Sequence, residues 1–211
     1  IKTLLCLVLF TLVTTGVFAK SPIVLCYDLS PAPPFINKQD NSSKKHQGFF
    51  IDLINFVSKE ADVSFQLVSK PWKRCIQDGL SGKIDAIPGM MWTSERNKNF
   101  EFPRDINNEL NREQHFWSVD NIIFVSKMSK LQWDGKQFTG VDKGIGAGLG
   151  FLVYDMLAAD GVLATDIRDS ELGLSLVAKN RLDGYVTNAF VGKQIIRQLN
   201  MSELITSLPI P

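Results

Sequence analysis

The strongest structural signal in this chain of 211 residues is the stretch Asp85-Ala86-Ile87-Pro88-Gly89-Met90-Met91-Trp92-Thr93-Ser94-Glu95-Arg96. A strand is predicted to end at Gly89, where a ligand can approach the backbone closely. Thr93 is then expected to cap a helix whose first turn holds Arg96. This order places Arg96 at the carboxyl edge of a sheet, where open α/β folds bind ligands. Its planar guanidinium suits a carboxylate, and the alternative is a surface ion pair with Glu95 or Glu101.

Strand and helix patterns alternate in the residues that precede this stretch. Three short apolar runs, Ile23 to Tyr27, Ser64 to Val68 and Ile84 to Ile87, are predicted as strands. An apolar stripe at helical spacing predicts a helix from Phe49 to Ala61, and a second helix is expected from Trp72 to about Leu80. The resulting β–α–β–α–β order indicates a mostly parallel sheet with covering helices.

The second half of the chain shows a similar pattern. A β-rich run spans Asn121 to Val125, and four alternate glycines precede an apolar helical stretch from Phe151 to Ala159. The elements expected after it are a strand from Leu163 to Ile167, a helix capped by Asp169 or Ser170 that ends near Asn180, and a strand from Leu182 to Val186.

A short internal echo links the two halves. Gly82-Lys83-Ile84-Asp85-Ala86 is matched by Asn180-Arg181-Leu182-Asp183-Gly184, and each follows an amphipathic helix and opens a buried strand. One such helix–turn–strand unit in each half is expected of a duplicated α/β architecture.

The first nineteen residues are typical of a secretory signal peptide. Lys2 supplies a positive charge, Leu4 to Val13 is uncharged and apolar, and Val17-Phe18-Ala19 offers small residues at the cleavage positions. The apolar run is short for a membrane-spanning helix, so an uncleaved anchor is the weaker interpretation. Cys6 is expected to be discarded with this segment.

The composition excludes several classes of partner. Removal of Lys2 with the signal peptide reduces the 23 basic residues to 22, which equals the 22 acidic residues. The balanced charge favours neither nucleic acid nor an anionic membrane surface as a partner. The apolar fraction of 45% favours a packed globule over a disordered chain. The length after cleavage allows either one large domain or two small lobes.

Two cysteines remain after cleavage, Cys26 and Cys75. An even pair in an oxidising compartment favours a disulfide, and the alternative is two buried free thiols.

The sequence gives no support for a metal site, a nucleophilic catalyst or a cofactor. His46 and His115 lack the spacing of metal ligands, and no Gly-x-Ser-x-Gly elbow occurs. The glycines from 144 to 150 do not fit the dinucleotide fingerprint, because Leu149 and Phe151 stand at the third-glycine positions. A glycine-rich approach to a helix can still present N–H groups to an anion.

Together these motifs resemble the bacterial extracellular solute-binding proteins, family 3, which are the periplasmic polar-amino-acid receptors of ABC transporters. The matching pieces are Tyr27-Asp28 with Pro33-Pro34-Phe35, Gly48-Phe49-Phe50-Ile51-Asp52-Leu53, Gly82-Lys83-Ile84-Asp85, Gly89 to Arg96 with Phe102-Pro103, and Asp183-Gly184-Tyr185. The resemblance implies the two-lobed type II periplasmic binding protein fold, with a mostly parallel sheet flanked by helices in each lobe.

The resemblance also implies a division of the chain. We expect a signal peptide over residues 1–19, the first lobe over 20–120 and the second lobe over 121–206. Residues 207–211 resemble the start of a return crossover to the first lobe, so the chain is expected to be the C-terminally truncated part of a longer gene product.

Ligand-binding roles in both lobes follow from the same resemblance. Arg96 matches the arginine that clamps the ligand's α-carboxylate, and the backbone of Gly89 and Met91 is expected to face the ligand. The other matched cleft positions are Asp28 and Trp72 in the first lobe, with Trp72 where an aromatic ring commonly stacks, and Leu149 and Gly150 in the carboxylate-binding loop of the second.

Three positions depart from the family pattern. Asn188 replaces the aspartate that usually pairs with an α-ammonium group, Leu149 replaces a hydroxyl residue, and Met91 replaces a threonine. Loss of the counter-ion of a desolvated ammonium is costly. The ligand is therefore expected either to lack an α-ammonium or to use Asp28 instead.

We expect a monomeric, periplasmic protein that captures a small polar solute, an amino acid or a related carboxylate, and delivers it to the membrane permease of an ABC transporter. No enzymatic activity and no cofactor is expected. The alternatives are the ligand-sensing domain of a signalling system and, less favoured, a dehydratase-like enzyme on the same fold.

Overall fold

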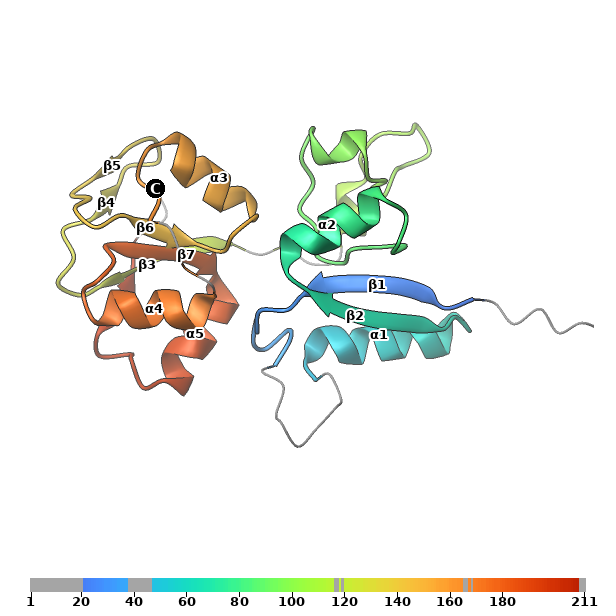
Figure 1. The fold of residues 1–211 in the computed structure, drawn as a ribbon, viewed down its shortest axis with the longest axis horizontal. Coiled ribbons are helices and arrows are strands. Elements are labelled where there is room, and N and C mark those ends of the chain that lie inside the picture. The colour runs from blue at the N-terminus through green and yellow to red at the C-terminus, as the bar shows by residue number, and fades with distance from the viewer. Residues whose placement is uncertain are drawn as a thin grey trace, which may run out of the picture.

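The computed structural model describes residues 21–37, 47–115, 118, 120–164, 167 and 169–208. The predicted signal peptide, including Cys6, and His46 lie outside these residues. The described elements form two lobes that lie side by side, as Figure 1 shows. No helix in the described part of the chain combines the length and the apolar character needed to cross a membrane.

The first lobe is built on two parallel strands with a helix on each face (Figure 1). β1 (Ile23–Asp28) pairs with β2 (Phe65–Lys70) along its whole length. α1 (Phe49–Glu60) covers one face of the pair and α2 (Trp72–Leu80) covers the other. These four elements follow the predicted strand and helix ranges within one or two residues.

Alternation along β1 decides which side chains meet which helix. Leu25 and Tyr27 point to one face and pack with Phe50 of α1. Cys26 points to the opposite face and lies fully buried against Cys75 of α2. Side chains of a strand alternate with a period of two, so one strand serves both layers of the lobe.

The third strand predicted over 84–87 is present only as a single parallel bridge between Leu25 and Ala86. The carboxylate Oδ2 of Asp85 accepts a hydrogen bond from the backbone N of Val24 at 2.7 Å. A side chain therefore takes the place of a ladder carbonyl, and the prediction of a full strand was wrong in extent.

The helix predicted after Thr93 is only a 3₁₀ turn, Arg96–Lys98. The expected cap is made, since Thr93 Oγ1 accepts from the backbone N of Arg96 at 3.1 Å. Pro103 follows shortly afterwards, and the residue before a proline disfavours helical backbone. A second 3₁₀ turn spans Arg112–Gln114.

The second lobe contains a mixed four-stranded sheet in the order β6-β7-β3-β8. Its strands are β3 (Asn121–Ser126), β6 (Ile145–Ala147), β7 (Gly184–Asn188) and β8 (Ile205–Ser207). β3 runs antiparallel to both of its neighbours, and β6 runs parallel to β7. A small hairpin of β4 (Gln132–Trp133) and β5 (Phe138–Thr139) stands beside this sheet.

Three helices cover the two faces of this sheet (Figure 1). α3 (Leu152–Ala159) lies on one face, and α4 (Ser170–Ala178) and α5 (Ala189–Gln198) lie on the other. Tyr185 packs into the core on the α4 and α5 side, and its neighbour Val186 packs on the α3 side. The predicted cap of α4 is formed, because Asp169 Oδ1 accepts from Leu172 N at 2.8 Å.

Three details of the second lobe differ from the sequence-based expectations. Among the described residues of the strand predicted over 163–167, which are 163, 164 and 167, Leu163 makes a bridge with Ile145. β7 begins two residues later than predicted. α5 was not predicted, although Val191 and Ile195 are buried one helical turn apart on one face.

Two aspartates of the internal echo hold equivalent places in the two lobes. Asp183 Oδ2 accepts from the backbone N of Asp142 at 2.7 Å and of Gly144 at 2.9 Å, and also from Lys143 N. Asp85 accepts from the backbone N of Val24 in the first lobe. Each carboxylate thus ties the turn before a strand to the beginning of another strand.

At the end of the described chain, the backbone N of Leu208 donates to Ile123 O at 2.9 Å and so extends the pairing of β8 with β3. Residues 209–211, which belong to the predicted return crossover, lie outside the described residues.

Candidate functional site

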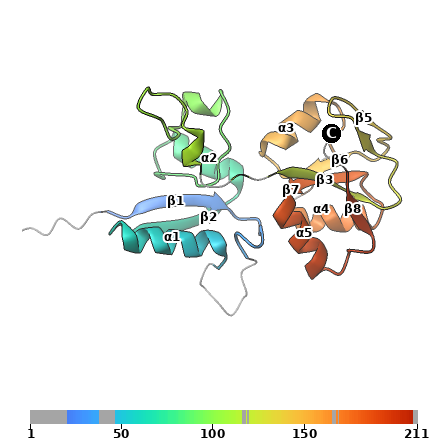
Figure 2. The same ribbon diagram turned by 180° about the vertical axis from the view of Figure 1, so that it is seen from behind.

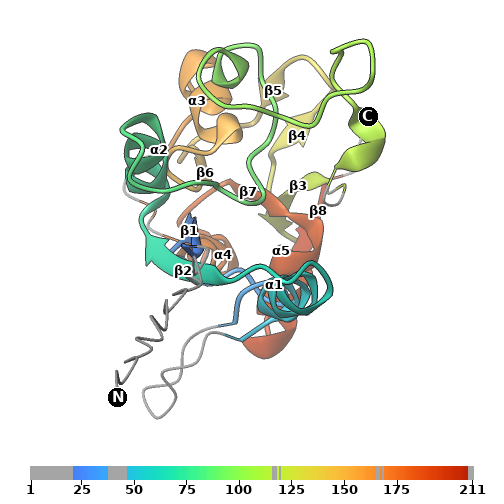
Figure 3. The same ribbon diagram turned by 90° about the vertical axis from the view of Figure 1, so that its right-hand side faces the viewer.

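Strands from both lobes direct their carboxyl ends toward the gap between the lobes. β1 and β2 end toward the second lobe, and the parallel pair β6 and β7 ends toward the first (Figures 1 and 2). α2 and α3 lie on one side of this gap, and α1, α4 and α5 lie on the other (Figure 3). Loops at the carboxyl ends of strands are where open α/β sheets bind ligands, so this gap is the candidate site.

Asp28 is the last residue of β1 and lies half-buried at the gap. Its Oδ1 accepts from the backbone N of Ser30 at 3.3 Å. Burial raises the pKa of the Asp28 carboxyl, while nearby backbone N–H groups, including that of Trp72, act in the opposite direction. The charge of Asp28 also helps to raise the pKa of Tyr185, so it acts on the second lobe across the gap.

Trp72 is the first residue of α2 and contacts the second lobe. Its ring stacks on Phe151, with 5.6 Å between the centroids and 25° between the planes. The side chain is 6% exposed, and its indole Nε1 has no hydrogen-bond partner among the described residues. A Cβ on Gly150, which has φ +84°, would lie 3.2 Å from Trp72 Cδ1. Glycine at 150 therefore lets the second lobe approach the indole closely.

Arg96 extends beside Trp72, with its Cζ 5.9 Å from the centroid of the indole. Nη1 donates to the carbonyl oxygen of Met91 at 3.0 Å. Burial lowers the pKa of the guanidinium, and the charge of Asp155 on α3 opposes this effect. The guanidinium is thus partly desolvated next to the second lobe.

The carboxylates considered as surface partners for Arg96 pair with other residues. Glu95 forms an ion pair with Lys98, and Glu101 forms one with Arg104 at 3.3 Å. Within the described ranges Arg96 makes no ion pair, so it can bind a carboxylate that the chain does not supply.

The two backbone positions expected to face the ligand lie open to solvent. Gly89 has φ +77°, and a Cβ built on it would meet nothing within 4 Å. The side chain of Met91 is 45% exposed, and its carbonyl oxygen holds Arg96.

The loop that leads into α3 brings the second lobe to Trp72 and Arg96. Leu149 is exposed, Gly150 lies against Trp72, and Phe151 forms the stack. No described side chain caps the N-terminus of α3. An uncapped helix start offers N–H groups and a partial positive charge to an anion.

Asn188 ends β7 and also begins α5. Its Oδ1 accepts from the backbone N of Phe190 at 2.8 Å and of Val191 at 3.3 Å. The side-chain oxygen is thus engaged in capping, and the amide Nδ2 can only donate.

A hydroxyl cluster lies next to this strand end. Ser170 Oγ lies 3.1 Å from Thr187 Oγ1 and 3.4 Å from the Tyr185 hydroxyl. Tyr185 is 1% exposed, and burial raises its pKa to about 12. The cluster therefore stays neutral at physiological pH and can exchange hydrogen bonds with a polar ligand.

Sequence reasoning missed Phe151, Asp155 and the hydroxyl cluster as site residues. Their positions in the sequence could have indicated them. Phe151 and Ser170 begin predicted helices, Asp155 lies in the first turn of one, and Tyr185 and Thr187 lie at the carboxyl end of a predicted strand. The structure brings Asp28, Trp72, Arg96 and Gly150 together and leaves Leu149 at the rim.

A cavity with a volume of about 1600 Å³ lies on the α1, α4 and α5 side of the gap. Pro31 and Pro33 line it from the first lobe, and Asp169 and Gln198 from the second. Closed pockets for small ligands usually measure roughly 300–1,000 Å³, so this cavity is an opening between the lobes. It includes neither Trp72 nor Arg96, and we place the candidate site at those residues because the polar groups converge there.

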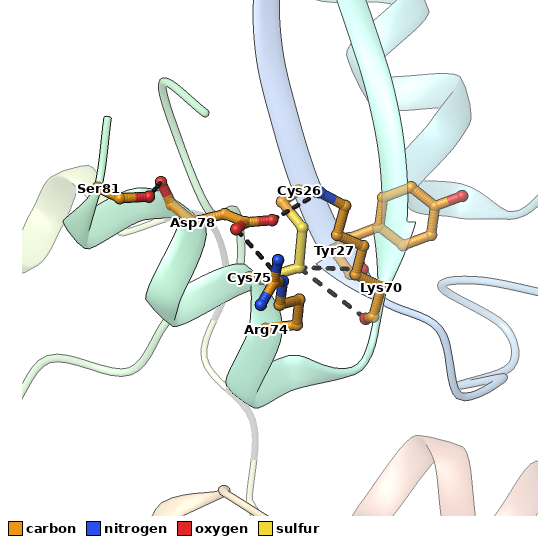
Figure 4. A network of polar contacts seen from close by, with 7 residues as sticks. All are labelled: Cys26, Tyr27, Lys70, Arg74, Cys75, Asp78 and Ser81. Carbon is orange, nitrogen blue, oxygen red and sulfur yellow. Dashed lines mark hydrogen bonds and ion pairs between the residues drawn. A yellow bond between two sulfur atoms is a disulfide. The ribbon is translucent and has the colours of Figure 1, made fainter. Parts of the chain in front are cut away.

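The predicted disulfide is formed between Cys26 and Cys75, with 5.6 Å between their Cα atoms (Figure 4). It joins β1 to α2 close to Asp28 and Trp72. Sγ of Cys75 lies 3.5 Å from the carbonyl oxygen of Tyr27 and carries no hydrogen in the disulfide, so this approach is a packing contact.

A buried ionic network stands beside the disulfide (Figure 4). Asp78 of α2 is 2% exposed, and its Oδ2 accepts from Lys70 Nζ at 2.6 Å. Arg74 Nε lies 3.4 Å from Oδ1 of the same carboxylate. The hydrogen bond from Lys70 is the largest cause that holds the pKa of Asp78 below its ordinary value. Disulfide and network together fix the start of α2, which carries Trp72.

Among the described residues there is no group of three or more histidine, cysteine or acidic side chains arranged to bind a metal ion.

Comparison with known proteins gives the fold and a family match over part of the chain. The model of the bacterial extracellular solute-binding proteins, family 3, matches residues 23–116. No curated protein matches the sequence. A histidine kinase sensor domain with similarity to periplasmic binding proteins matches with a TM-score of 0.68 and 19% identity, over 89% of this chain and 76% of that one.

Two further solved structures show the same fold. The arginine-, lysine-, histidine-binding protein ArtJ from Geobacillus stearothermophilus has a TM-score of 0.66 and 19% identity, over 90% of this chain and 76% of its own. The ancestral amino acid-binding protein AncCDT-1, a precursor of cyclohexadienyl dehydratase, has a TM-score of 0.65 and 20% identity, over 90% and 78%. Residues 23–116 thus match the model of the bacterial extracellular solute-binding proteins, family 3, and the described residues of the chain adopt the two-lobed type II periplasmic binding protein fold.

Proposed function

We propose that this protein captures a small polar solute, an amino acid or a related carboxylate, between its two lobes and delivers it to an ABC-type permease. It acts in the periplasm as a monomer and releases the solute unchanged. The ligand-binding residues are Asp28, Trp72, Gly89, Met91 and Arg96 in the first lobe and Leu149, Gly150 and Asn188 in the second.

The observation that carries this proposal is that the Arg96 guanidinium is partly buried and has no ion-pair partner among the described residues. The carbonyl oxygen of Met91 orients the guanidinium. An arginine held in this way at the carboxyl ends of strands is prepared to bind a carboxylate. The family match and the fold shared with ArtJ support the same function.

The proposed mechanism has two steps. The solute first docks on the first lobe, where Arg96 binds its carboxylate and Asp28 is placed to pair with a cationic group. The second lobe then closes by a hinge motion and brings the start of α3 over the anion. Closure around a bound solute is what a permease would recognise.

A thermal-shift screen against amino acids, polyamines and small carboxylates tests this function. A ligand at a hundredfold its dissociation constant adds about 2.7 kcal/mol and raises Tm by roughly 5–10 °C. Arg96→Ala should abolish the response to every carboxylate, while the exposed Arg197→Ala on α5 should retain it. A full response from Arg96→Ala would refute the assigned role of Arg96.

The likeness to a histidine kinase sensor domain favours sensing as a second candidate. The two functions use the same cleft and differ in the partner that reads its closure. Stimulation of ATP hydrolysis by the reconstituted permease supports transport, and stimulation of kinase autophosphorylation supports sensing. The fold shared with a dehydratase precursor makes one further control necessary, which is recovery of the bound ligand unchanged.

A further inference from the structure

The contact between Trp72 and Phe151 joins the two lobes through aromatic rings alone. The rings are close to parallel, at 25°, with centroids 5.6 Å apart. This is an offset stack, a geometry that suits aromatic partners and other flat π systems. Phe151 keeps 41% of its surface exposed in this contact, so its ring is a partly open wall at the rim of the gap.

Trp72 also presents a polar group that the chain does not satisfy. Its side chain is 94% buried, and Nε1 has no hydrogen-bond acceptor among the described residues. A buried donor without an acceptor is unfavourable, and tryptophan N–H groups usually find a partner when they are buried. The missing acceptor is therefore expected to come from a molecule that enters between the lobes.

The guanidinium of Arg96 beside the stack favours an anion as that molecule. Arg96 lies 5.9 Å from the Trp72 ring without an ion-pair partner among the described residues. The stem of Lys73 lies against Gly150, within 2.9 Å of the place where a Cβ would stand. Asp155 and Asp28 are acidic groups close to Arg96 and Trp72 and equal these two positive charges in number, so the preference for an anion rests on Arg96, which has no ion-pair partner among the described residues.

The loop before α3 has a backbone conformation that places Phe151 against Trp72. Gly150 adopts φ +84°, and any side chain there would collide with Lys73 and Trp72. Phe151 occupies the N-cap position of α3 but gives that helix no side-chain cap. A residue that leaves the helix start uncapped and faces Trp72 is better explained by contact across the gap than by helix stability.

From these contacts we propose that Trp72 and Phe151 form the two walls of a slot that selects a planar, conjugated carboxylate over a saturated one. The ligand inserts between the rings, its carboxylate binds Arg96, and a ligand acceptor takes the indole N–H of Trp72. The inference rests on the proposed function and narrows it to one class of solute.

Matched pairs of ligands test this slot in the complete chain. We would titrate benzoate against cyclohexanecarboxylate by calorimetry, because the two acids share a charge and a similar size and differ in planarity. Benzoate should bind roughly tenfold more tightly, since two aromatic walls each favour a flat partner. Equal affinities, or a preference for the saturated acid, would overturn the slot and leave solute capture standing.

Variants separate the two walls. Phe151→Leu should bring the two affinities within about twofold of each other while the saturated acid still binds. Trp72→Phe keeps a ring and removes the N–H, so it should weaken both acids and retain the preference. Phe56→Leu, on the exposed face of α1, is the matched control and should change neither. Absence of binding by any carboxylate or amino acid to the folded protein would instead contradict the proposed function itself.

Discussion

The two lobes present strand ends to the same gap but are stabilised by different interactions. The described sheet of the first lobe has two strands. The Cys26–Cys75 disulfide and the ion pair of the buried Asp78 carboxylate with Lys70 link this sheet to α2 and stabilise the lobe. The described sheet of the second lobe has four strands with an apolar cluster on each face, and Leu174 and Val177 are fully buried in one of these clusters. A small sheet buries little apolar surface, so covalent and ionic links matter more there.

The contrast has a functional side. Asp28, Trp72 and Arg96 all belong to the first lobe, the one with the disulfide. The second lobe contributes the glycine loop before α3, a hydroxyl cluster and the start of α5. We infer that the first lobe keeps its binding residues rigid, while the second supplies a well-packed body that moves over them.

Loss of the disulfide should have the largest effect. The bridge closes a loop with a sequence separation of 49 residues, for which the chain-entropy estimate is about 4 kcal/mol. The double variant Cys26→Ala/Cys75→Ala should therefore lower Tm by roughly 8–15 °C in a calorimetric scan. Reductant should destabilise the wild type to the same extent and leave the variant unchanged. A variant that melts within 2 °C of the wild type would contradict the claim that the disulfide stabilises the first lobe.

A cavity in the core of the second lobe should have the next largest effect. Leu174 is fully buried on α4, so Leu174→Ala should cost about 3 kcal/mol of unfolding free energy in urea titrations. The exposed Leu199→Ala serves as the control, with a cost below about 1 kcal/mol. The proposed division between the lobes predicts that the cost of Leu174→Ala is the same with or without reductant, although Phe35 of the first lobe packs against the cluster that contains Leu174. Strong coupling between the two changes would show one shared core.

Acid should weaken the first lobe through Asp78. Its pKa is lowered in the folded protein, so its contribution to stability is present above its ordinary pKa, near 4, and is lost as pH falls through the lower folded value. Urea midpoints measured between pH 7 and pH 3 should fall steeply for the wild type. Asp78→Asn should flatten that fall and start from a lower midpoint at pH 7, and Glu60→Gln should leave the curve unchanged. Parallel curves for wild type and Asp78→Asn would contradict the assigned role of the carboxylate.

Asp28 should show a smaller effect of the opposite sign. Its pKa is raised by burial, so its contribution to stability is complete below its ordinary pKa and is lost as pH rises through the folded value. At pH 7 the charged carboxylate therefore destabilises the free protein, and Asp28→Asn should raise Tm by roughly 1–3 °C. The same variant should weaken cationic solutes in titration calorimetry. A lower Tm for Asp28→Asn would show that its hydrogen bonds outweigh the cost of its burial.

Much of the first lobe could be predicted from the sequence because its signals are local. Apolar runs marked the two strands, and Pro71 marked the start of α2. The short third strand was overestimated because the Asp85 side chain replaces a backbone acceptor, a contact between residues 61 positions apart. Hydrophobicity patterns carry no information about such a contact.

The candidate site could be predicted only in part, because some of its contacts also join residues that are distant in the sequence. Arg96 was predicted because its guanidinium suits a carboxylate, and Trp72 because it matches a cleft position in the proteins that the sequence resembles. Phe151 belonged to a predicted apolar helix, and only the folded chain shows its ring on Trp72. Asn188 was identified as a site residue, while its second role as the cap of α5 depended on a helix that was not predicted.

Asn188 caps α5 and is also a proposed ligand-binding residue, and this combination bears on how such a protein changes its ligand over evolutionary time. Asparagine and aspartate cap helices about equally well, so an exchange at this position would leave α5 intact. The same exchange would add a negative charge at the end of β7, beside the gap. Most changes to a binding site threaten the fold that holds it, but here a change of ligand charge would be nearly neutral for folding. Selection for a different solute can therefore act at this position without a compensating substitution that restores the stability of the fold.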